Sequence, residues 1–204
     1  ETLANPRSFL ATKIYTIDGK VLGSLYKENR SEARYEDRPS HLKEALISTE
    51  DVRYYSHAGV DFYGLGRAIA FFGKRGGGST ITQQLAKLLF TEEYESTTFF
   101  ERALLQKPKE WIIASRLEHH YTKGEIMTMY LNRYDFLNQA VGIRSAANIY
   151  FNKEVGDLKV EECAMLVGML KNSALFNPLR RMDLVTTRRN VVLNQMQKYG
   201  YLEE

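Results

Sequence analysis

Cysteine is nearly absent from this sequence, since Cys163 is the only one among 204 residues. A disulfide bond within the chain is therefore excluded, and the redox compartment stays open. Because Cys163 lies in an apolar stretch, we expect it to be a small core residue. Long apolar runs are also absent: no stretch reaches the roughly 18 residues of a membrane-spanning helix, so we expect no such helix in the chain.

The sequence also has no large excess of positive or negative charge. Lys and Arg number 28 and Asp and Glu number 25, which gives a net charge of +3. This mild basic bias does not indicate nucleic acid, and no nucleic acid partner is expected, but it suits an anionic partner such as a phosphate or a membrane surface. The composition, 44% hydrophobic and 26% charged, is typical of one globular domain with or without a small appendage.

Helical patterns dominate the chain beyond Pro39, where apolar residues recur at helical spacing and capping pairs mark helix starts. Pro108 should kink or break one of these helices. The expected helices start at Ser40, at Thr80 with Gln83 as capping partner, at Thr98 with Glu101, near Lys109, at Thr122 with Glu125, at Asp157 and near Asp183. The last of them ends near Tyr199 and has Val185, Val192 and Met196 on one face, which we expect to be its inner face.

Residues 13–25 have a different pattern. Here β-branched and aromatic residues flank Asp18-Gly19, a favoured pair for a tight hairpin turn. The sequence therefore predicts a mostly α fold with one small N-terminal β-hairpin.

A first candidate for chemistry is the segment 50–61. On a helix, Glu50, Tyr54 and His57 would share one face, because they stand at i, i+4 and i+7. A carboxylate beside aromatic rings is partly desolvated, which suits a general base. The alternative is a helix end with ordinary surface charges.

A second candidate is the glycine run 76–78, which leads straight into a helix. A glycine-rich turn before a helix N-terminus presents free backbone N–H groups and suits an anion. Thr80, Gln84 and Lys87 should lie opposite the apolar stripe of this helix, where they could hold phosphate oxygens. The alternative is a flexible turn before a capped amphipathic helix, and the segment is not a P-loop because no Gly-Lys-Ser/Thr closes it.

The third candidate is Glu110, which should lie on one helix face with Ala114 and Leu117. It is either a buried functional acid or a helix-start charge favoured by the helix dipole. The apolar residues of the following segment, 123–132, indicate core.

Together these segments resemble the signature motifs of the peptidoglycan glycosyltransferases, glycosyltransferase family 51. This family is the polymerase domain of class A penicillin-binding proteins and of monofunctional transglycosylases. Residues 77–84 match the second signature in full, which is a specific match for eight residues. The other matching segments are 50–57, 107–110, 123–132, and 164–168 with Asn177-Pro178 and Arg188-Arg189.

The resemblance implies a lysozyme-like, two-lobed helical fold. Residues 31–204 would form the glycosyltransferase domain, and residues 1–30 the hairpin and the linker from a membrane anchor. Since the chain begins with Glu1 rather than Met, we expect that anchor to lie outside it. The implied location is the outer face of the bacterial cytoplasmic membrane.

The resemblance also implies a function in peptidoglycan synthesis and cell shape, the polymerisation of lipid II with inversion. Glu50 would be the general base and Glu110 the second acid on the donor side. Gln84, Lys87 and Lys107 would hold the pyrophosphate of the donor, supported by Asp51, His57, Ser79 and Thr80. The expected partners are lipid II, the growing glycan chain, the membrane surface and moenomycin-type inhibitors. No cofactor is required on this interpretation, apart from an optional magnesium or manganese ion on the pyrophosphate.

Three positions and the length of one stretch depart from the family pattern. Gln106 stands where the family usually has arginine, Pro108 lies inside the third signature where it would shift Glu110, and Tyr54 replaces a phenylalanine. The stretch 62–75 is shorter than usual. Its apolar residues and the closing Lys74-Arg75 would rest on a bilayer, or else form a buried helix end.

Two rival functions stay open. One is a lysozyme-like glycan hydrolase with Glu50 as general acid, although such an enzyme has no pyrophosphate to hold. The other is a domain that binds lipid II or a partner without catalysis. The pattern Ser40-x-x-Lys43 resembles a transpeptidase nucleophile by chance, because no Lys-Thr-Gly follows it.

Overall fold

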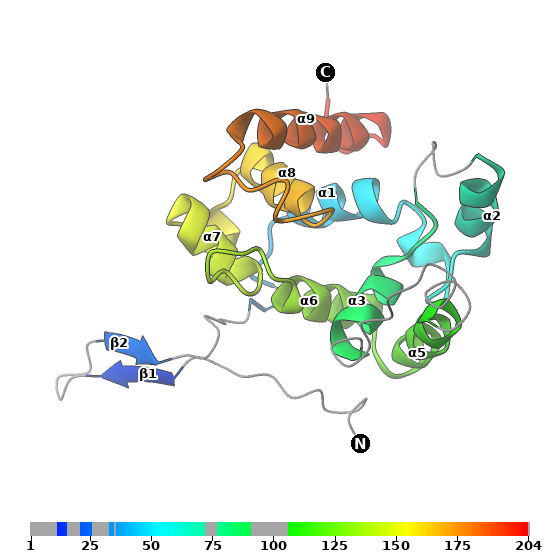
Figure 1. The fold of residues 1–204 in the computed structure, drawn as a ribbon, viewed down its shortest axis with the longest axis horizontal. Coiled ribbons are helices and arrows are strands. Elements are labelled where there is room, and N and C mark those ends of the chain that lie inside the picture. Colours follow the sequence, from blue (N-terminus) through cyan, green and yellow to red (C-terminus); the bar gives the residue numbers. More distant parts are fainter. Residues whose placement is uncertain are drawn as a thin grey trace. The chain divides into compact units, whose positions relative to one another are not determined.

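The computed structural model describes residues 12–15, 21–25, 33–34, 36–71, 77–90 and 106–203 (Figure 1). These residues are mostly helical, which confirms the predicted class. The helices are α1 (Ser40–Glu50), α2 (Phe62–Ala70), α3 (Ile81–Phe90), α5 (Lys107–His120), α6 (Lys123–Arg133), α7 (Ile143–Phe151), α8 (Val160–Met169) and α9 (Met182–Lys198), with 3-10 helices η1 (Tyr54–Ser56) and η3 (Val155–Asp157).

Two short strands, β1 (Thr12–Tyr15) and β2 (Val21–Leu25), pair antiparallel. Thr12 lies opposite Leu25, and the pairing is irregular between Ile14 and Tyr15. The predicted turn at Asp18-Gly19 lies outside the described residues, so the hairpin as a whole stays a prediction.

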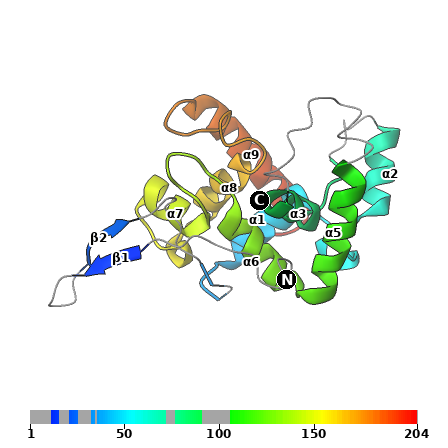
Figure 2. The same cartoon turned by 60° about the horizontal axis from the view of Figure 1, so that its bottom comes forward.

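The chain divides into two compact units. Leu46–Tyr130 belongs to the first unit, and Leu131–Glu204 belongs to the second together with the described residues up to Ala45. In the first unit α3 and α5 lie side by side, and in the second α8 packs against α9 (Figures 1 and 2). All the predicted site residues, from Glu50 to Glu110, belong to the first unit.

The core of the first unit confirms the first part of the predicted apolar stripe of α3, Ile81 and Leu85, whereas Leu88 and Leu89 of that stripe are half-buried. Ile81 and Leu85 are fully buried, as are Ala114 and Leu117 of α5. The loop after η1 approaches α5 closely at Gly59, whose φ is +92°. A Cβ there would lie 2.8 Å from the backbone carbonyl of Ala114, so glycine is required for this contact.

The second unit is built around α8. Cys163 is completely buried in it, which confirms the prediction of a core residue, and burial raises the pKa of its thiol to about 12 with the nearby charges of Glu162 and Glu161. The predicted inner face of α9, with Val185, Val192 and Met196, is also buried.

Several predicted helix starts are confirmed by their capping bonds. The Thr80 amide donates to Gln83 Oε1 at 3.3 Å, and the Thr122 amide donates to Glu125 Oε2 at 2.7 Å. The start at Asp157 is wrong, because η3 covers that residue and α8 begins at Val160, after Lys159 donates its amide to Glu162 at 2.8 Å. The Thr98 capping pair lies outside the described residues, and α2 and α7 were not predicted.

Pro108 lies in the first turn of α5. The helix from Thr98 that it was predicted to kink or break lies outside the described residues. The first N–H groups of a helix have no partner within it, so a residue without an N–H fits there at no cost. The helix therefore starts at Lys107, about two residues before the predicted start.

Candidate active site

Asp51 joins the first motif to the glycine-rich motif. The backbone N–H of Ile81, at the start of α3, donates to Asp51 Oδ2 at 3.0 Å. His57 Nε2 lies 3.0 Å from both carboxylate oxygens of Asp51. The side chains of His57 and Asp51 are only 6% and 3% exposed, so this carboxylate acts within the protein, as a cap on the positive end of α3.

The same contacts end α1. The helix stops at Glu50, and the chain turns through η1 to an extended His57. The prediction that Glu50, Tyr54 and His57 share one helix face is therefore wrong. Long-range bonds of the Asp51 side chain outweigh the local preference for a longer helix.

Thr80 is a structural support of the second motif. Its hydroxyl donates to the carbonyl oxygen of Gly59 at 2.6 Å and accepts from the Gln83 amide at 3.1 Å. With 1% of its surface exposed, Thr80 does not lie on an open face with Gln84 and Lys87, and that part of the prediction is wrong. Its short side chain satisfies donors at the helix start instead.

Glu50 lies beside Gln84. The Gln84 Nε2 donates to Glu50 Oε2 at 3.0 Å, and Gln84 Oε1 accepts from the hydroxyl of Tyr130 at 2.7 Å. The structure thus brings the predicted general base together with a residue that was predicted to bind the pyrophosphate.

Lys107 links the glycine-rich turn to the third motif. Its Nζ lies 2.7 Å from Glu110 Oε2 and 3.3 Å from Ser79 Oγ. The Glu110 side chain is 8% exposed and that of Lys107 is 44% exposed, so a buried carboxylate orients an accessible cation. With Pro108 between them, Glu110 and Lys107 still form an ion pair at i, i+3. Lys87 is exposed on α3.

Gly78 explains part of the glycine requirement of the turn. A Cβ on Gly78 would lie 3.0 Å from Leu65 Cα, so a larger residue would push the turn away from α2. Gly76 lies outside the described residues.

The sequence analysis missed a buried charged network behind the site. Lys123 Nζ donates to Glu118 Oε1 and to the His57 carbonyl oxygen, each at 2.7 Å. The Thr82 hydroxyl donates to the same Glu118 oxygen at 2.5 Å. These four residues come from α3, α5, α6 and the loop after η1. The only cue in the sequence was that Lys123 opens the segment 123–132, which matches a family signature.

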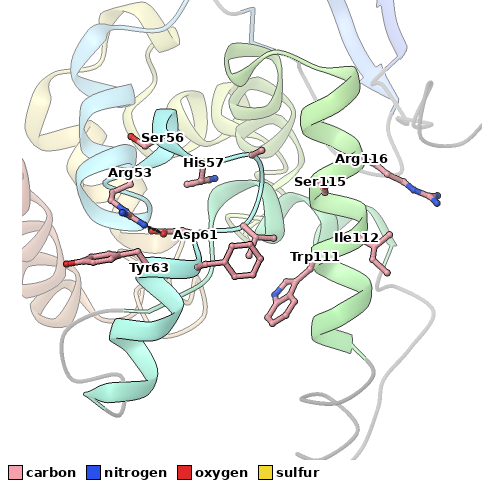
Figure 3. Close-up of a pocket in the computed structure, with 12 residues that line it drawn as sticks. Arg53, Ser56, His57, Asp61, Tyr63, Trp111, Ile112, Ser115 and Arg116 are labelled. Carbon is pink, nitrogen blue, oxygen red and sulfur yellow. Dashed lines mark hydrogen bonds and ion pairs between the residues drawn. The ribbon is translucent and has the colours of Figure 1, made fainter.

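A pocket of about 750 Å³ opens in the first unit beside the start of α2 and the middle of α5 (Figure 3). Arg53 forms an ion pair with Asp61 there and lies 4.3 Å from the ring centre of Tyr63. Burial alone would raise the pKa of Asp61, but hydrogen bonds from Arg53 and Gly64 lower it below its ordinary value. Of the predicted site residues only His57 lines this pocket, so the pocket is not the predicted catalytic centre.

Among the described residues no group of three or more His, Cys, Asp or Glu side chains is arranged to hold a metal ion. The described helices also include none that is long and apolar enough to cross a membrane.

Residues 18–197 match the sequence model of the transglycosylase family. The chain belongs to the transglycosylase family. This match covers most of the chain and confirms the resemblance indicated by the motifs. It assigns the chain to the class of peptidoglycan glycosyltransferases, which are enzymes of peptidoglycan synthesis.

Relatives in two bacteria support the family assignment. Penicillin-binding protein 1F of Bacillus subtilis is 40% identical over 196 residues, which cover 94% of this chain and 26% of the relative. Penicillin-binding protein 1A of Escherichia coli is 38% identical over 207 residues, which cover 100% of this chain and 24% of the relative. The transglycosylase chain thus spans about a quarter of the length of these relatives.

A solved structure supports the fold. The crystal structure of penicillin-binding protein 1A from Haemophilus influenzae aligns with a TM-score of 0.52 and 21% sequence identity, over 97% of this chain and 20% of that one. At this identity the likeness shows that the two share a fold.

Proposed function

We propose that this transglycosylase chain polymerises lipid II into glycan strands with inversion at the anomeric carbon. The observation that carries the proposal is a carboxylate, Glu50, in the same compact unit as a cation, Lys107, which is held at the glycine-rich start of α3. In the proposed reaction the acceptor hydroxyl loses its proton to Glu50 and its oxygen attacks the anomeric carbon of the donor. The bond from that carbon to the pyrophosphate breaks, and a single displacement inverts the centre.

Glu50 suits the general base because it is half-buried and accepts a hydrogen bond from Gln84. The hydrogen bond holds the carboxylate in a fixed orientation, which a general base needs in order to reach the acceptor hydroxyl. Asp51 and His57 would keep Glu50 and the start of α3 in place through their buried contacts.

The pyrophosphate would bind at the glycine-rich turn. Lys107 and Lys87 would meet its charge, together with the hydroxyl of Ser79. Glu110 would fix Lys107 toward the donor, as their 2.7 Å contact suggests. Because Gln84 donates a hydrogen bond to Glu50, we propose that it positions the general base rather than binding the pyrophosphate.

A divalent cation is an optional further partner of the pyrophosphate. Gln106 carries no charge where the family usually has arginine, so magnesium or manganese would compensate for the missing cation. A magnesium titration of the polymerisation rate tests this part alone.

A membrane partner is proposed from the surface of the first unit. Phe62, Tyr63 and Ile112 are 71%, 67% and 57% exposed, and Arg53 and Arg116 line the pocket beside them. Apolar side chains flanked by cations suit the interface of an anionic bilayer. Lys74-Arg75, the predicted basic end of this patch, lies outside the described residues.

The same proposal covers the fold, the domain bounds and the location of the enzyme. The fold would be lysozyme-like and two-lobed, with residues 1–30 as the linker from an anchor outside this chain and residues 31–204 as the domain. The enzyme would work at the outer face of the cytoplasmic membrane, where moenomycin-type inhibitors would compete for its site.

Incubation of the purified protein with lipid II tests the function. We expect glycan polymer from the wild type and none from Glu50→Gln, since loss of a general base costs roughly 10²–10⁴ in rate. Glu44→Gln, on the same helix α1, is the matched control and should retain the rate. Release of sugars from finished peptidoglycan would instead support the hydrolase, and lipid II binding without polymer would support the binding-only domain.

A further inference from the structure

Three side chains from three helices form a chain of hydrogen bonds that ends on Glu50. Tyr130 on α6 donates its hydroxyl to Gln84 Oε1 at 2.7 Å, and Gln84 on α3 donates its Nε2 to Glu50 Oε2 at 3.0 Å. All three belong to the first unit. Tyr130 is only 1% exposed, whereas Gln84 and Glu50 are half-buried, so the hydroxyl acts from the core toward the site.

The hydroxyl decides how the Gln84 amide is turned. A side-chain amide has a donor end and an acceptor end, and an ionised carboxylate only accepts. With Tyr130 donating to Oε1, the NH₂ group is directed at Glu50. Turning the amide by half a rotation would set Oε1 against the carboxylate oxygen, which is repulsive.

We propose that Tyr130 is a positioning residue of the polymerisation reaction, which acts on Glu50 through Gln84. The inference rests on the proposed function of Glu50 as general base. Tyr130 holds Gln84 in the orientation in which its NH₂ group donates to Glu50, and this hydrogen bond keeps the Glu50 carboxylate in place. The hydroxyl makes this contribution without touching substrate.

Tyr130→Phe removes the hydroxyl and keeps the ring in the core. One hydrogen bond contributes about 1 kcal/mol, so we expect kcat at saturating lipid II to fall roughly fivefold to tenfold. The KM for lipid II should change by less than about twofold, because the substrate contacts are untouched. Wild-type kcat in this variant would overturn the proposal.

A double-mutant cycle separates positioning from packing. Gln84→Met keeps the side-chain volume and removes both hydrogen bonds. If Tyr130 acts through Gln84, the double variant should be no slower than Gln84→Met alone, since the link is already cut. Multiplied losses in the double variant would show that Tyr130 acts on the rate by another route, and would overturn the proposal.

Tyr134→Phe is the matched control. Tyr134 lies in the second unit and donates its hydroxyl to the carbonyl oxygens of Met169 and Leu170 at 3.1 and 3.0 Å. Both variants lose one tyrosine hydroxyl, so both should lower Tm by a few degrees, by about 4 °C or less. We expect only Tyr130→Phe to lower kcat, and an equal loss of kcat in both variants would overturn the proposal.

A readout independent of activity keeps this test apart from the test of function. The side-chain amide resonances of Gln84 in ¹⁵N-labelled protein should shift and exchange faster with water in Tyr130→Phe, and not in Tyr134→Phe. If the wild type makes no polymer, the proposed function fails while this signal still reports on the link. If the wild type makes polymer and the Gln84 signal does not respond to Tyr130→Phe, the proposed role of Tyr130 fails while the proposed function stands.

Discussion

Lys87 is the exposed cation of α3, one turn beyond Gln84. If it meets the pyrophosphate, Lys87→Ala should weaken donor binding roughly tenfold to a hundredfold, because a charge-assisted contact contributes about 1.5–3 kcal/mol. Binding of a non-reactive lipid II analogue by calorimetry measures this. Lys171→Ala, another exposed lysine, is the control. Unchanged affinity in Lys87→Ala would remove Lys87 from the proposed site.

The side chain of Thr80 lies elsewhere than predicted. Thr80 was predicted on the open face of its helix with Gln84 and Lys87, yet it is buried against the Gly59 carbonyl. The helix was predicted correctly. The position of the Thr80 side chain is decided by the loop at Gly59, which packs against the start of the helix.

At the scale of the element, the start of α8 depends on Glu162. This carboxylate accepts from Lys153 Nζ at 2.7 Å and from the Lys159 amide at 2.8 Å. Burial alone would raise the pKa of Glu162, but the hydrogen bonds and charges of Lys153 and Lys159 lower it below its ordinary value of 4.5. A carboxyl whose pKa falls on folding adds stability above its unfolded pKa and loses that contribution as the pH drops through the folded pKa.

We therefore expect Glu162→Gln to lower the free energy of unfolding at pH 7. The gap between variant and wild type should close as the pH falls below the ordinary value of 4.5. Urea unfolding at a series of pH values measures it, with the exposed neighbour Glu161→Gln as control. A gap that stays constant with pH would contradict this role of the charge.

The network of Glu118, Lys123 and Thr82 ties three helices to the loop after η1. The side chains of Lys123 and Glu118 are 20% and 7% exposed, so removing one partner leaves a largely buried charge. Glu118→Gln should cost about 3–5 kcal/mol of unfolding free energy, as for other buried pairs that lose one member. Chemical denaturation measures this cost.

Glu154→Gln is the control for that prediction, because the pair of Arg144 and Glu154 is 40% and 64% exposed. An exposed pair contributes little, so this variant should unfold almost as the wild type does. Equal losses in the two variants would mean that the network adds no more than a surface ion pair.

At the scale of the whole molecule, a net charge of +3 and the exposed aromatic residues of the first unit predict binding to anionic vesicles. Sedimentation should show more protein bound to vesicles with anionic lipid than to neutral ones, and less at high salt. Replacing Phe62 and Tyr63 by serine should weaken binding to both kinds of vesicle.

The matched control replaces Leu179 and Met182, which are 69% and 60% exposed in the second unit, by serine. Removal of these apolar side chains should leave vesicle binding intact. Equal binding by both double variants would contradict a membrane surface at Phe62 and Tyr63.

The sequence by itself determined the family, the mostly helical class and the helix starts at Thr80 and Thr122. It also predicted the inner face of α9 and the burial of Cys163. These features depend on short-range patterns: a run of eight signature residues, capping pairs three residues apart and apolar residues at helical spacing. Such patterns are complete within a few turns of chain, so they can be recognised without the fold.

Only the tertiary structure decided which side chains of the site form hydrogen bonds with each other. Glu50 and Gln84 are 34 residues apart, Gln84 and Tyr130 are 46 apart, and Asp51 caps a helix that starts 30 residues later. No local pattern encodes the partner of a polar side chain at such separations. The buried donors and acceptors must be paired once the helices pack, and that requirement ended α1 at Glu50 and turned Gln84 toward Glu50.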